Sequence, residues 1–413
     1  MNLKNHSFME IKNVTEELKQ NARLGIYIHV PFCPHICPYC DFTKTSKFTK
    51  KDIEIFLAQC SIQFESLLKY VPVEYQIVTV YFGGGTPGLI PGKMYKPLLN
   101  QIKARFVIEE LTIETNPFSN SAGMFDDLFA QGFNRVTLGV QTLCNKTLKI
   151  LGRKHTAEQA IQNIIAARRS GIGQIQVDLI YGIKNGTRSL GLDCEVDQIA
   201  SAGATGISGY ALTLENRTAF GNSEWAEDSV ASTDYDLLCK ACDAAEFNQI
   251  ETSNFSKFEA KHNNIYWHGL PYLGIGTGSH GFLPSSPENI YGRRYVTGKV
   301  TESWSPANDK LLFSTDSAKL FEMHFEDTRC KKDSINELLF TLLRTPRGIP
   351  RAWLTQNFGS DFERDIFSDI ILSDAIKFGN ILNDEKSFRL TRKEKLFGDY
   401  WTGRLVSVLP EPF

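Results

Sequence analysis

Three cysteines stand close together near the start of the sequence, at Cys33, Cys37 and Cys40. Cysteine thiolates are soft ligands, and iron–sulfur clusters are held in proteins through such sulfur atoms. Each iron of a cubane cluster requires a ligand, and this segment offers one thiolate fewer than the cube has irons. The spacing therefore predicts a [4Fe-4S] cluster with one open iron, to which a small molecule can bind directly.

A structural zinc ion is the alternative for these cysteines, because zinc prefers a complete tetrahedron of protein ligands. His35 is the candidate for the missing ligand, but it lies between two of the cysteines, where it would crowd a tetrahedral arrangement. Residue 42, where a further thiolate could follow, is Phe42. The cluster is the preferred interpretation, and a zinc-stabilised domain serving only for protein interactions remains the alternative.

Further residues with chemical potential follow β-branched and aromatic runs, which alternate with segments of helical periodicity. One such helical segment is Ala157–Arg169. Alternation of this kind implies parallel strands joined by right-handed crossovers, with functional residues at the carboxyl ends of the strands. We therefore predict an α/β fold with a partial (β/α)6 barrel. Its expected strands are Ile26–Val30, Ile77–Phe82, Leu111–Thr115, Arg135–Val140, Ile175–Tyr181 and Gly206–Leu212.

The ends of these predicted strands carry small and polar residues. The cysteine segment follows the first strand, and a glycine run, Gly83–Gly88, follows the second. Small residues let a ligand approach backbone amides, although a tight turn requires the same residues. The later strands end near Glu114, Gln141 and Asp178. Carboxylates such as Glu114 and Asp178 can accept hydrogen bonds from a polar ligand, although surface or capping roles are more common for single carboxylates.

Length and composition favour an ordinary multidomain globular protein. The chain has 413 residues, and its 42% apolar and 22% charged residues argue against disorder or a coiled coil. A net charge of −2 gives no reason to expect nucleic acid as a partner. No stretch is apolar enough for a transmembrane span or a signal peptide, so we expect a cytoplasmic protein. The predicted organisation is an N-terminal extension (1–20), the barrel (21–245), a barrel-closing segment (246–305) and a C-terminal helical domain (306–413).

The segment YIHVPFCPHICPYCDF, from Tyr27 to Phe42, resembles the radical S-adenosylmethionine (SAM) superfamily. More narrowly, it resembles the family of oxygen-independent coproporphyrinogen III oxidase. The resemblance implies that the open iron chelates SAM and that the reduced cluster cleaves it to a 5′-deoxyadenosyl radical. By position in the family pattern, the implied SAM contacts are Tyr27, Gly85, Thr86, Pro87, Glu114, Gln141, Arg153, Asp178 and Ala211.

Two features resemble the heme-chaperone branch of that family rather than the oxidase branch. Phe42 occupies the position where the oxidase branch carries an additional cysteine. The H-N-x-x-Y-W element, with His262, Tyr266 and Trp267, resembles an element of the chaperone branch. A histidine can ligate heme iron, and aromatic rings can pack on the macrocycle. The alternative is that His262 is hydrogen-bonded in the barrel mouth, with His268 and His280 as competing ligands.

The C-terminal segments SINELLFTLLRTPRGI and LTRKEKLF resemble the small winged-helix-like domain of the chaperone branch. The resemblance implies a heme chaperone that delivers heme to acceptor proteins such as respiratory cytochromes. It also implies an electron donor and a possible homodimer. The alternative activity is that of oxygen-independent coproporphyrinogen III oxidase, which decarboxylates propionate groups during porphyrin biosynthesis.

The remaining cysteines are not grouped as ligands. Cys239 and Cys242 form a C-x-x-C pair, but they fall in a segment with helical periodicity and no preceding βα turn. We expect them to be buried or half-buried small residues rather than redox groups. The same is expected of Cys60, Cys144, Cys194 and Cys330.

Overall fold

The fold was analysed in a computed structural model of the chain. The structure describes residues 22–117, 123–184, 190–286, 290–298, 321–326, 329–410 and 412. The predicted N-terminal extension, residues 1–20, lies outside the described residues.

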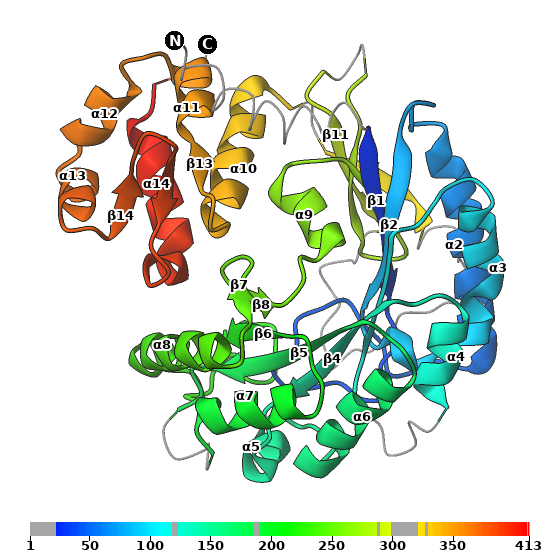
Figure 1. The fold of residues 1–413 in the computed structure, drawn as a ribbon. Coiled ribbons are helices and arrows are strands. Elements are labelled where there is room, and N and C mark those ends of the chain that lie inside the picture. Colours follow the sequence, from blue (N-terminus) through cyan, green and yellow to red (C-terminus); the bar gives the residue numbers. More distant parts are fainter. Residues whose placement is uncertain are drawn as a thin grey trace.

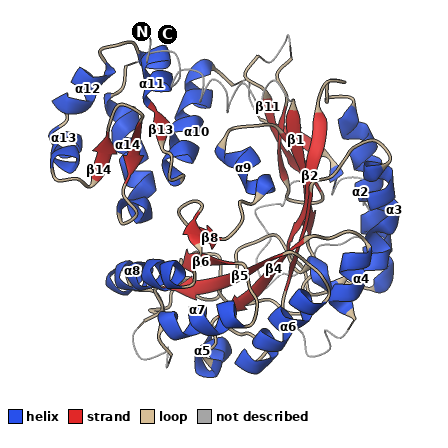
Figure 2. Cartoon of the chain, in the orientation of Figure 1, coloured by secondary structure: helices blue, strands red, loops and turns tan. Residues whose placement is uncertain are grey.

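A long curved sheet forms the centre of the molecule, and its middle six strands are parallel and ordered as in the sequence. Each of the six predicted strands is present, so the prediction of a partial barrel is confirmed. Figures 1 and 2 show the sheet curving from β1 and β2 toward β5 and β6, with helices along its outer side. These strands are β1 (Arg23–Val30), β2 (Gln76–Gly84), β3 (Glu110–Thr115), β4 (Arg135–Gln141), β5 (Gln174–Tyr181) and β6 (Gly206–Ala211).

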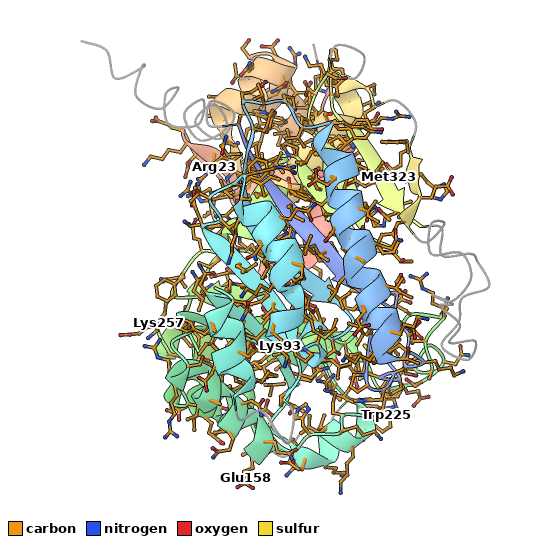
Figure 3. The ribbon with its side chains drawn as sticks, turned by 90° about the vertical axis from the view of Figure 1, so that its right-hand side faces the viewer. Arg23, Lys93, Glu158, Trp225, Lys257 and Met323 are labelled. Carbon is orange, nitrogen blue, oxygen red and sulfur yellow. The ribbon has the colours of Figure 1, made fainter. Side chains whose placement is uncertain are left out.

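Helices connect successive parallel strands, as the alternating sequence pattern predicts. The predicted helix Ala157–Arg169 is confirmed as α6, and Thr156 caps it by accepting a hydrogen bond from the Gln159 amide (3.2 Å). Figure 3 shows α2 and α3 running side by side along the outer face of the sheet. The connecting helices are α2 (Lys50–Leu68), the short 3-10 helix η1 (Pro87–Leu89), α3 (Gly92–Lys103), α4 (Met124–Ala130), α5 (Asn145–Ile150), α6 and α7 (Leu192–Ser201), and α8 (Asp228–Ala244) follows the last parallel strand, β6.

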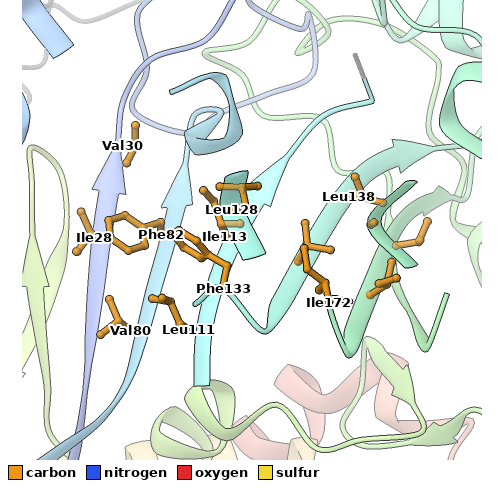
Figure 4. Close-up of a cluster of buried hydrophobic side chains, with 14 of the residues drawn as sticks. Ile28, Val30, Val80, Phe82, Leu111, Ile113, Leu128, Phe133, Leu138 and Ile172 are labelled. Atoms are coloured by element: carbon orange, nitrogen blue, oxygen red, sulfur yellow. The ribbon is translucent and has the colours of Figure 1, made fainter. Parts of the chain in front are cut away.

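The parallel strands are largely buried, and burial on both faces explains the nearly continuous apolar run Ile77–Phe82 of β2. Phe82 in β2 is fully buried, and its ring centroid lies 4.6 Å from that of Tyr95 and 5.7 Å from that of Phe133. Figure 4 shows Ile28, Phe82 and Ile113 on neighbouring strands within the same cluster. This packing holds the strands rigidly, and it fixes where their carboxyl ends lie.

Additional strands extend the sheet at both edges. At one edge β9 pairs parallel with β1, and β10, β11 and β12 continue antiparallel; at the other edge β8 and β7 follow β6. The sequence predicts that residues from 306 onward belong to the C-terminal domain, but β12 pairs with β11 and so belongs to the central sheet. The sequence does not predict this strand because three residues are too short for a recognisable pattern. These elements are β7 (Asn248–Gln249), β8 (Asn254–Ser256), α9 (Lys261–Trp267), β9 (Tyr272–Ile275), β10 (His280–Leu283), β11 (Arg293–Thr297) and β12 (Met323–Phe325).

The C-terminal elements surround a second apolar core that includes Leu339, Leu354 and Phe388. Helices precede and flank a small antiparallel sheet of order β13-β15-β14, in agreement with the predicted helical, winged-helix-like region. The elements are α10 (Lys331–Arg344), β13 (Ile349–Pro350), α11 (Arg351–Phe358), α12 (Phe362–Ser368), α13 (Ile370–Lys377), β14 (Ile381–Asn383), β15 (Ser387–Leu390), η4 (Glu394–Phe397) and α14 (Gly398–Val408).

The cysteines outside the cysteine loop fall into two groups, buried and exposed. Cys60, Cys144, Cys239 and Cys242 are buried, as expected. Cys194 and Cys330 are exposed, so the prediction was wrong for these two. Cys194 lies on the solvent side of the amphipathic helix α7, and Cys330 immediately precedes α10. Within the described part of the chain, no helix has the length and apolar character needed to cross a membrane.

Candidate functional site

The cysteine segment forms a loop directly after β1, and backbone hydrogen bonds close it. The Cys33 amide donates to the Thr45 carbonyl oxygen at 3.0 Å, and the Thr45 amide donates to the carbonyl of Pro31 at 2.7 Å. The buried ammonium of Lys44 donates to the carbonyl oxygen of Cys40 at 2.7 Å. The cysteines therefore occupy an ordered loop at the carboxyl end of the first strand.

The thiols of this loop lie in different electrostatic surroundings. Burial raises the pKa of Cys33 to about 11, although a hydrogen bond from Thr86 (3.5 Å) opposes the effect. Burial also acts to raise the pKa of Cys37, but His35 (3.7 Å from Sγ) and the Arg153 guanidinium (3.5 Å) outweigh it and lower that pKa to about 7. Cys37 is thus prepared to be a thiolate near neutral pH, the form that binds metal. Among residues 22–412 as far as they are described, no group of three or more His, Cys, Asp or Glu side chains is arranged to hold a metal ion.

A chain of hydrogen bonds joins the cysteine loop to three other strand ends. Arg153 donates to the Gly139 carbonyl oxygen (2.6 Å) and to the side-chain oxygen of Asn116. The Asn116 amide in turn donates to Thr86 Oγ1 at 3.0 Å, and Thr86 contacts Cys33. Asn116 was not among the predicted site residues, although its position directly after β3 is the signal that the other members share. This chain holds the cysteines and the glycine run at a fixed separation.

The glycine run turns sharply where β2 ends. Gly84 has φ of +105°, and a Cβ there would come within 2.5 Å of the His29 ring. A Cβ on Gly85 would lie 2.7 Å from the Phe32 carbonyl oxygen, and the Gly85 amide donates to Val30 at 2.8 Å. Glycine is required at both positions because the backbone passes this close to the cysteine loop. Pro87 then begins η1.

Gly84→Ala is expected to destabilise the protein by about 1–3 kcal/mol, because it places a side chain at positive φ and against a buried ring. The free energy of unfolding in urea measures this loss. Gly173→Ala is the matched control, since no atom lies within 4 Å of a Cβ at that position and its φ is not positive. Equal stability of the two variants would contradict the structural role of Gly84.

Glu114 lies at the end of β3, where it accepts hydrogen bonds from Tyr81 Oη (2.7 Å) and from the Gly84 amide (3.0 Å). Burial raises the pKa of Glu114, whereas these two hydrogen bonds act to lower it. Tyr27 lies beside this group, its ring centroid 6.0 Å from that of Tyr81, and its hydroxyl is 3.1 Å from His29 Nδ1. The structure therefore brings the predicted residues Tyr27 and Glu114 together with the glycine run.

The remaining predicted residues lie at the ends of β4, β5 and β6. Gln141 ends β4 in a left-handed conformation with φ of +70°, which turns the chain out of the sheet. Ala211 ends β6 and is paired with Tyr181 of β5. Asp178 is half-buried in β5, and its Oδ1 has no hydrogen-bond partner in the described structure. The buried Nε of Arg153 likewise has no hydrogen-bond partner in the described structure. Buried polar atoms are normally paired, so these two fit a polar ligand between the strand ends.

Burial, and secondly the Glu114 carboxylate, raise the pKa of Asp178 to about 7. The folded protein therefore holds a proton on Asp178 that the unfolded chain releases near pH 4, so its contribution to stability falls as pH rises toward 7. Asp178→Asn removes this dependence. We compare the free energies of unfolding of the variant and the unmodified protein, both without ligands. The difference, variant minus unmodified protein, is expected to increase by roughly 1–3 kcal/mol between pH 5 and pH 8. A constant difference in urea denaturation across this range would contradict the shift.

His262 is enclosed rather than open. The side chain is 1% exposed, with Nδ1 2.8 Å from Thr79 Oγ1 and Nε2 2.7 Å from Tyr266 Oη. Its ring stacks on Tyr81 at 5.2 Å between centroids. Burial, and secondly the charge of Arg135, lower the pKa of His262 to about 3, so the ring is neutral. Both ring nitrogens are thus engaged, and Tyr81 links this group to Glu114.

The other residues of that element face different ways. Trp267 lies under the Arg344 guanidinium, 5.1 Å from the ring centroid, and so contacts the C-terminal helix α10. His268 is half-buried, with Nδ1 2.8 Å from the Asn264 carbonyl oxygen. His280 is exposed at the start of β10. Of the three predicted heme contacts, His262 and Tyr266 therefore contact each other, whereas Trp267 contacts α10.

Comparisons with known proteins agree with this fold. The family model of the Radical SAM superfamily matches residues 27–189. The heme chaperone HemW of Lactococcus lactis is 30% identical over 89% of this chain and 93% of its own length. The heme chaperone HemW of Bacillus subtilis is 28% identical over 93% of this chain and 99% of its own. The solved structure of coproporphyrinogen III oxidase (HemN) from Escherichia coli superposes with a TM-score of 0.73 at 16% identity, covering 96% and 94% of the two chains.

The curved parallel sheet, the cysteine loop after its first strand and the matching superfamily model define a radical SAM protein. Similarity to the HemW proteins extends over nearly the whole chain, including its C-terminal region. The chain belongs to the HemW family of radical SAM proteins. The likeness to HemN, at this low identity, concerns the fold alone.

Proposed function

We propose that this protein is a heme chaperone, which binds heme and delivers it to acceptor proteins such as respiratory cytochromes. The observation that carries the proposal is the match to HemW heme chaperones over about nine tenths of the chain and of each relative. Phe42, in place of the additional cysteine of the oxidase branch, supports the same choice. As further partners we propose an electron donor and a second copy of the chain, and we place the protein in the cytoplasm.

We propose that Cys33, Cys37 and Cys40 hold a [4Fe-4S] cluster. The donor set fits, because three thiols come from one ordered loop and Arg153 stabilises the thiolate of Cys37. When bound, a reduced cluster of this kind supplies an electron that can cleave SAM. Lys44 fixes the loop by donating to the carbonyl oxygens of Cys40 and Phe42, at 2.7 and 3.0 Å.

We propose that SAM lies across the strand ends beside this loop. Glu114 and Asp178 offer carboxylate oxygens to its ammonium group and ribose hydroxyls, and Arg153 offers its guanidinium to the carboxylate. The unpartnered Asp178 Oδ1 and Arg153 Nε favour this placement. The remaining proposed contacts provide walls and backbone groups: Tyr27, Gly85, Thr86, Pro87, Gln141 and Ala211.

His262, Tyr266 and Trp267 are the heme contacts proposed from the sequence. For His262 to ligate iron, Tyr266 or Thr79 must first release one of its ring nitrogens, because each nitrogen has a partner within 2.8 Å. The contact between Trp267 and Arg344 places the C-terminal helix α10 next to this element. We therefore expect heme binding to involve both the barrel and the C-terminal unit.

Two anaerobic assays on the reconstituted protein test the proposed function. Titration with ferric heme is expected to produce a saturable Soret band. Incubation with coproporphyrinogen III, SAM and a reductant is expected to yield no protoporphyrinogen. Product formation without saturable heme binding would instead assign the oxidase activity, and a colourless zinc protein with neither property would favour the interaction module.

A further inference from the structure

A cavity of about 380 Å³ lies between the barrel edge and the C-terminal unit, apart from the cysteine loop. Its volume falls in the range of ligand pockets, roughly 300–1,000 Å³. Figure 1 shows α9 beside α10. Residues that follow α9 form the barrel side of the cavity, and residues of α10 form the opposite side. Apolar and aromatic side chains from both sides line it: Leu270, Phe282, Leu283, Ile335, Leu338 and Trp353. Such a lining suits a large, flat, apolar molecule.

One histidine, His268, lines this cavity directly after α9. Its Nδ1 lies 2.8 Å from the Asn264 carbonyl oxygen, which can only accept a hydrogen bond. Nδ1 therefore carries the proton, and in the neutral ring the lone pair belongs to Nε2. A backbone hydrogen bond that fixes the tautomer and the ring orientation in this way is the usual support of a metal-binding histidine. His262, by contrast, has both nitrogens engaged and does not line the cavity.

Charged side chains of the cavity wall are mostly cationic. Arg23, Arg329 and Lys331 line it together with a single carboxylate, Glu337. Glu337 pairs with Arg329 at 2.5 Å and also with Arg294, so its charge is already balanced. Arg23 in turn pairs with Glu109, so Lys331 is the lining cation without an ion pair in the described part of the chain. The paired guanidinium groups of Arg23 and Arg329 can still donate hydrogen bonds to carboxylate groups at the edge of a ligand.

We propose that this cavity is the heme site, with His268 Nε2 as the axial ligand of the iron and the propionates directed to Arg23, Arg329 and Lys331. The apolar walls cover the faces of the macrocycle, and the ligand is held between the two units of the chain. This inference rests on the proposed heme-binding function, and it assigns the ligand to His268 instead of His262. Delivery of heme then requires the C-terminal unit to move away from the barrel edge.

Ferric heme titration of the full, cluster-loaded protein and its variants tests the proposal. His268→Ala is expected to weaken the Soret-band titration by about tenfold or more, equivalent to ~1.4 kcal/mol. The matched control His324→Ala, in β12, is expected to bind heme as the unmodified protein does. Ala352→Trp, which fills the cavity from α11 while leaving His268 in place, is also expected to weaken binding.

Rescue separates loss of the ligand from loss of folding. His268→Gly is expected to recover the Soret spectrum of the unmodified protein when imidazole is added, because free imidazole can occupy the position of the missing side chain. An unchanged band in His268→Ala, or a loss confined to His262→Ala, would overturn this site while leaving the heme-chaperone proposal intact. A lack of saturable heme binding by the unmodified protein would instead remove the proposed function itself.

Discussion

Cys37→Ser is expected to reduce the iron bound after anaerobic reconstitution from about four atoms per chain to nearly none. Serine preserves the size of the side chain, but its hydroxyl is not ionised near neutral pH and is a poor ligand for the iron of such a cluster. The pKa of the Cys37 thiol, about 7, reflects the stabilisation of its thiolate by His35 and Arg153 against the cost of burial. Loss of this thiolate leaves Cys33 and Cys40 with too few ligands to hold a cube.

Iron and sulfide analysis, together with the visible absorbance of the reconstituted protein, measures this effect. Cys194→Ser is the matched control, because Cys194 is an exposed thiol on α7, remote from the loop in sequence. Its iron content is expected to equal that of the unmodified protein. Equal losses in Cys194→Ser and Cys37→Ser, or a full complement of iron in Cys37→Ser, would contradict the assignment of the ligands.

Arg153→Met is expected to weaken SAM binding by about 10- to 100-fold, because hydrogen bonds to charged groups contribute about 1.5–3 kcal/mol. Methionine retains much of the length of the side chain but removes the guanidinium. The substitution deletes the proposed fork to the SAM carboxylate. It also removes the contacts with Cys37 Sγ (3.5 Å) and the Gly139 carbonyl oxygen (2.6 Å).

Equilibrium dialysis with SAM on the cluster-loaded protein measures the affinity. Arg105→Met provides the control, since Arg105 is an exposed arginine that forms an ion pair with Glu65, which is also exposed. Iron content should be measured alongside, because Arg153 also supports Cys37. Unaltered SAM affinity in an Arg153→Met protein with full iron content would remove Arg153 from the binding site.

The parallel strands were predictable from the sequence because they are buried on both faces. A nearly continuous apolar run such as Ile77–Phe82 of β2 leaves few other interpretations, and the glycines that follow it break the pattern. The short strands past residue 245 were not predictable in the same way. A three-residue strand such as β12 has no measurable periodicity, and only its pairing with β11 defines it.

The candidate site could be predicted only where a residue's position along its own strand was informative. Glu114 precedes the last residue of β3, and Asp178 lies in the carboxyl-terminal half of β5, so their convergence could be inferred from parallel topology. Tyr81 acquires its role through a partner some 30 residues away, and single-sequence patterns carry no signal for such a contact. For Asn116 the position directly after β3 was the available signal. The enclosure of His262 by Thr79 and Tyr266 depends on packing across β2 and α9, which the motif could not reveal.

Mössbauer spectroscopy of iron-57-reconstituted, oxygen-free protein, with and without SAM, tests the central assignment most directly. We expect the spectrum of a cubane cluster in which one iron, and only that iron, changes its parameters when SAM is added. A spectrum without a cubane cluster, or one in which no iron responds to SAM, would contradict the assignment of Cys33, Cys37 and Cys40 to a cluster with an open coordination site.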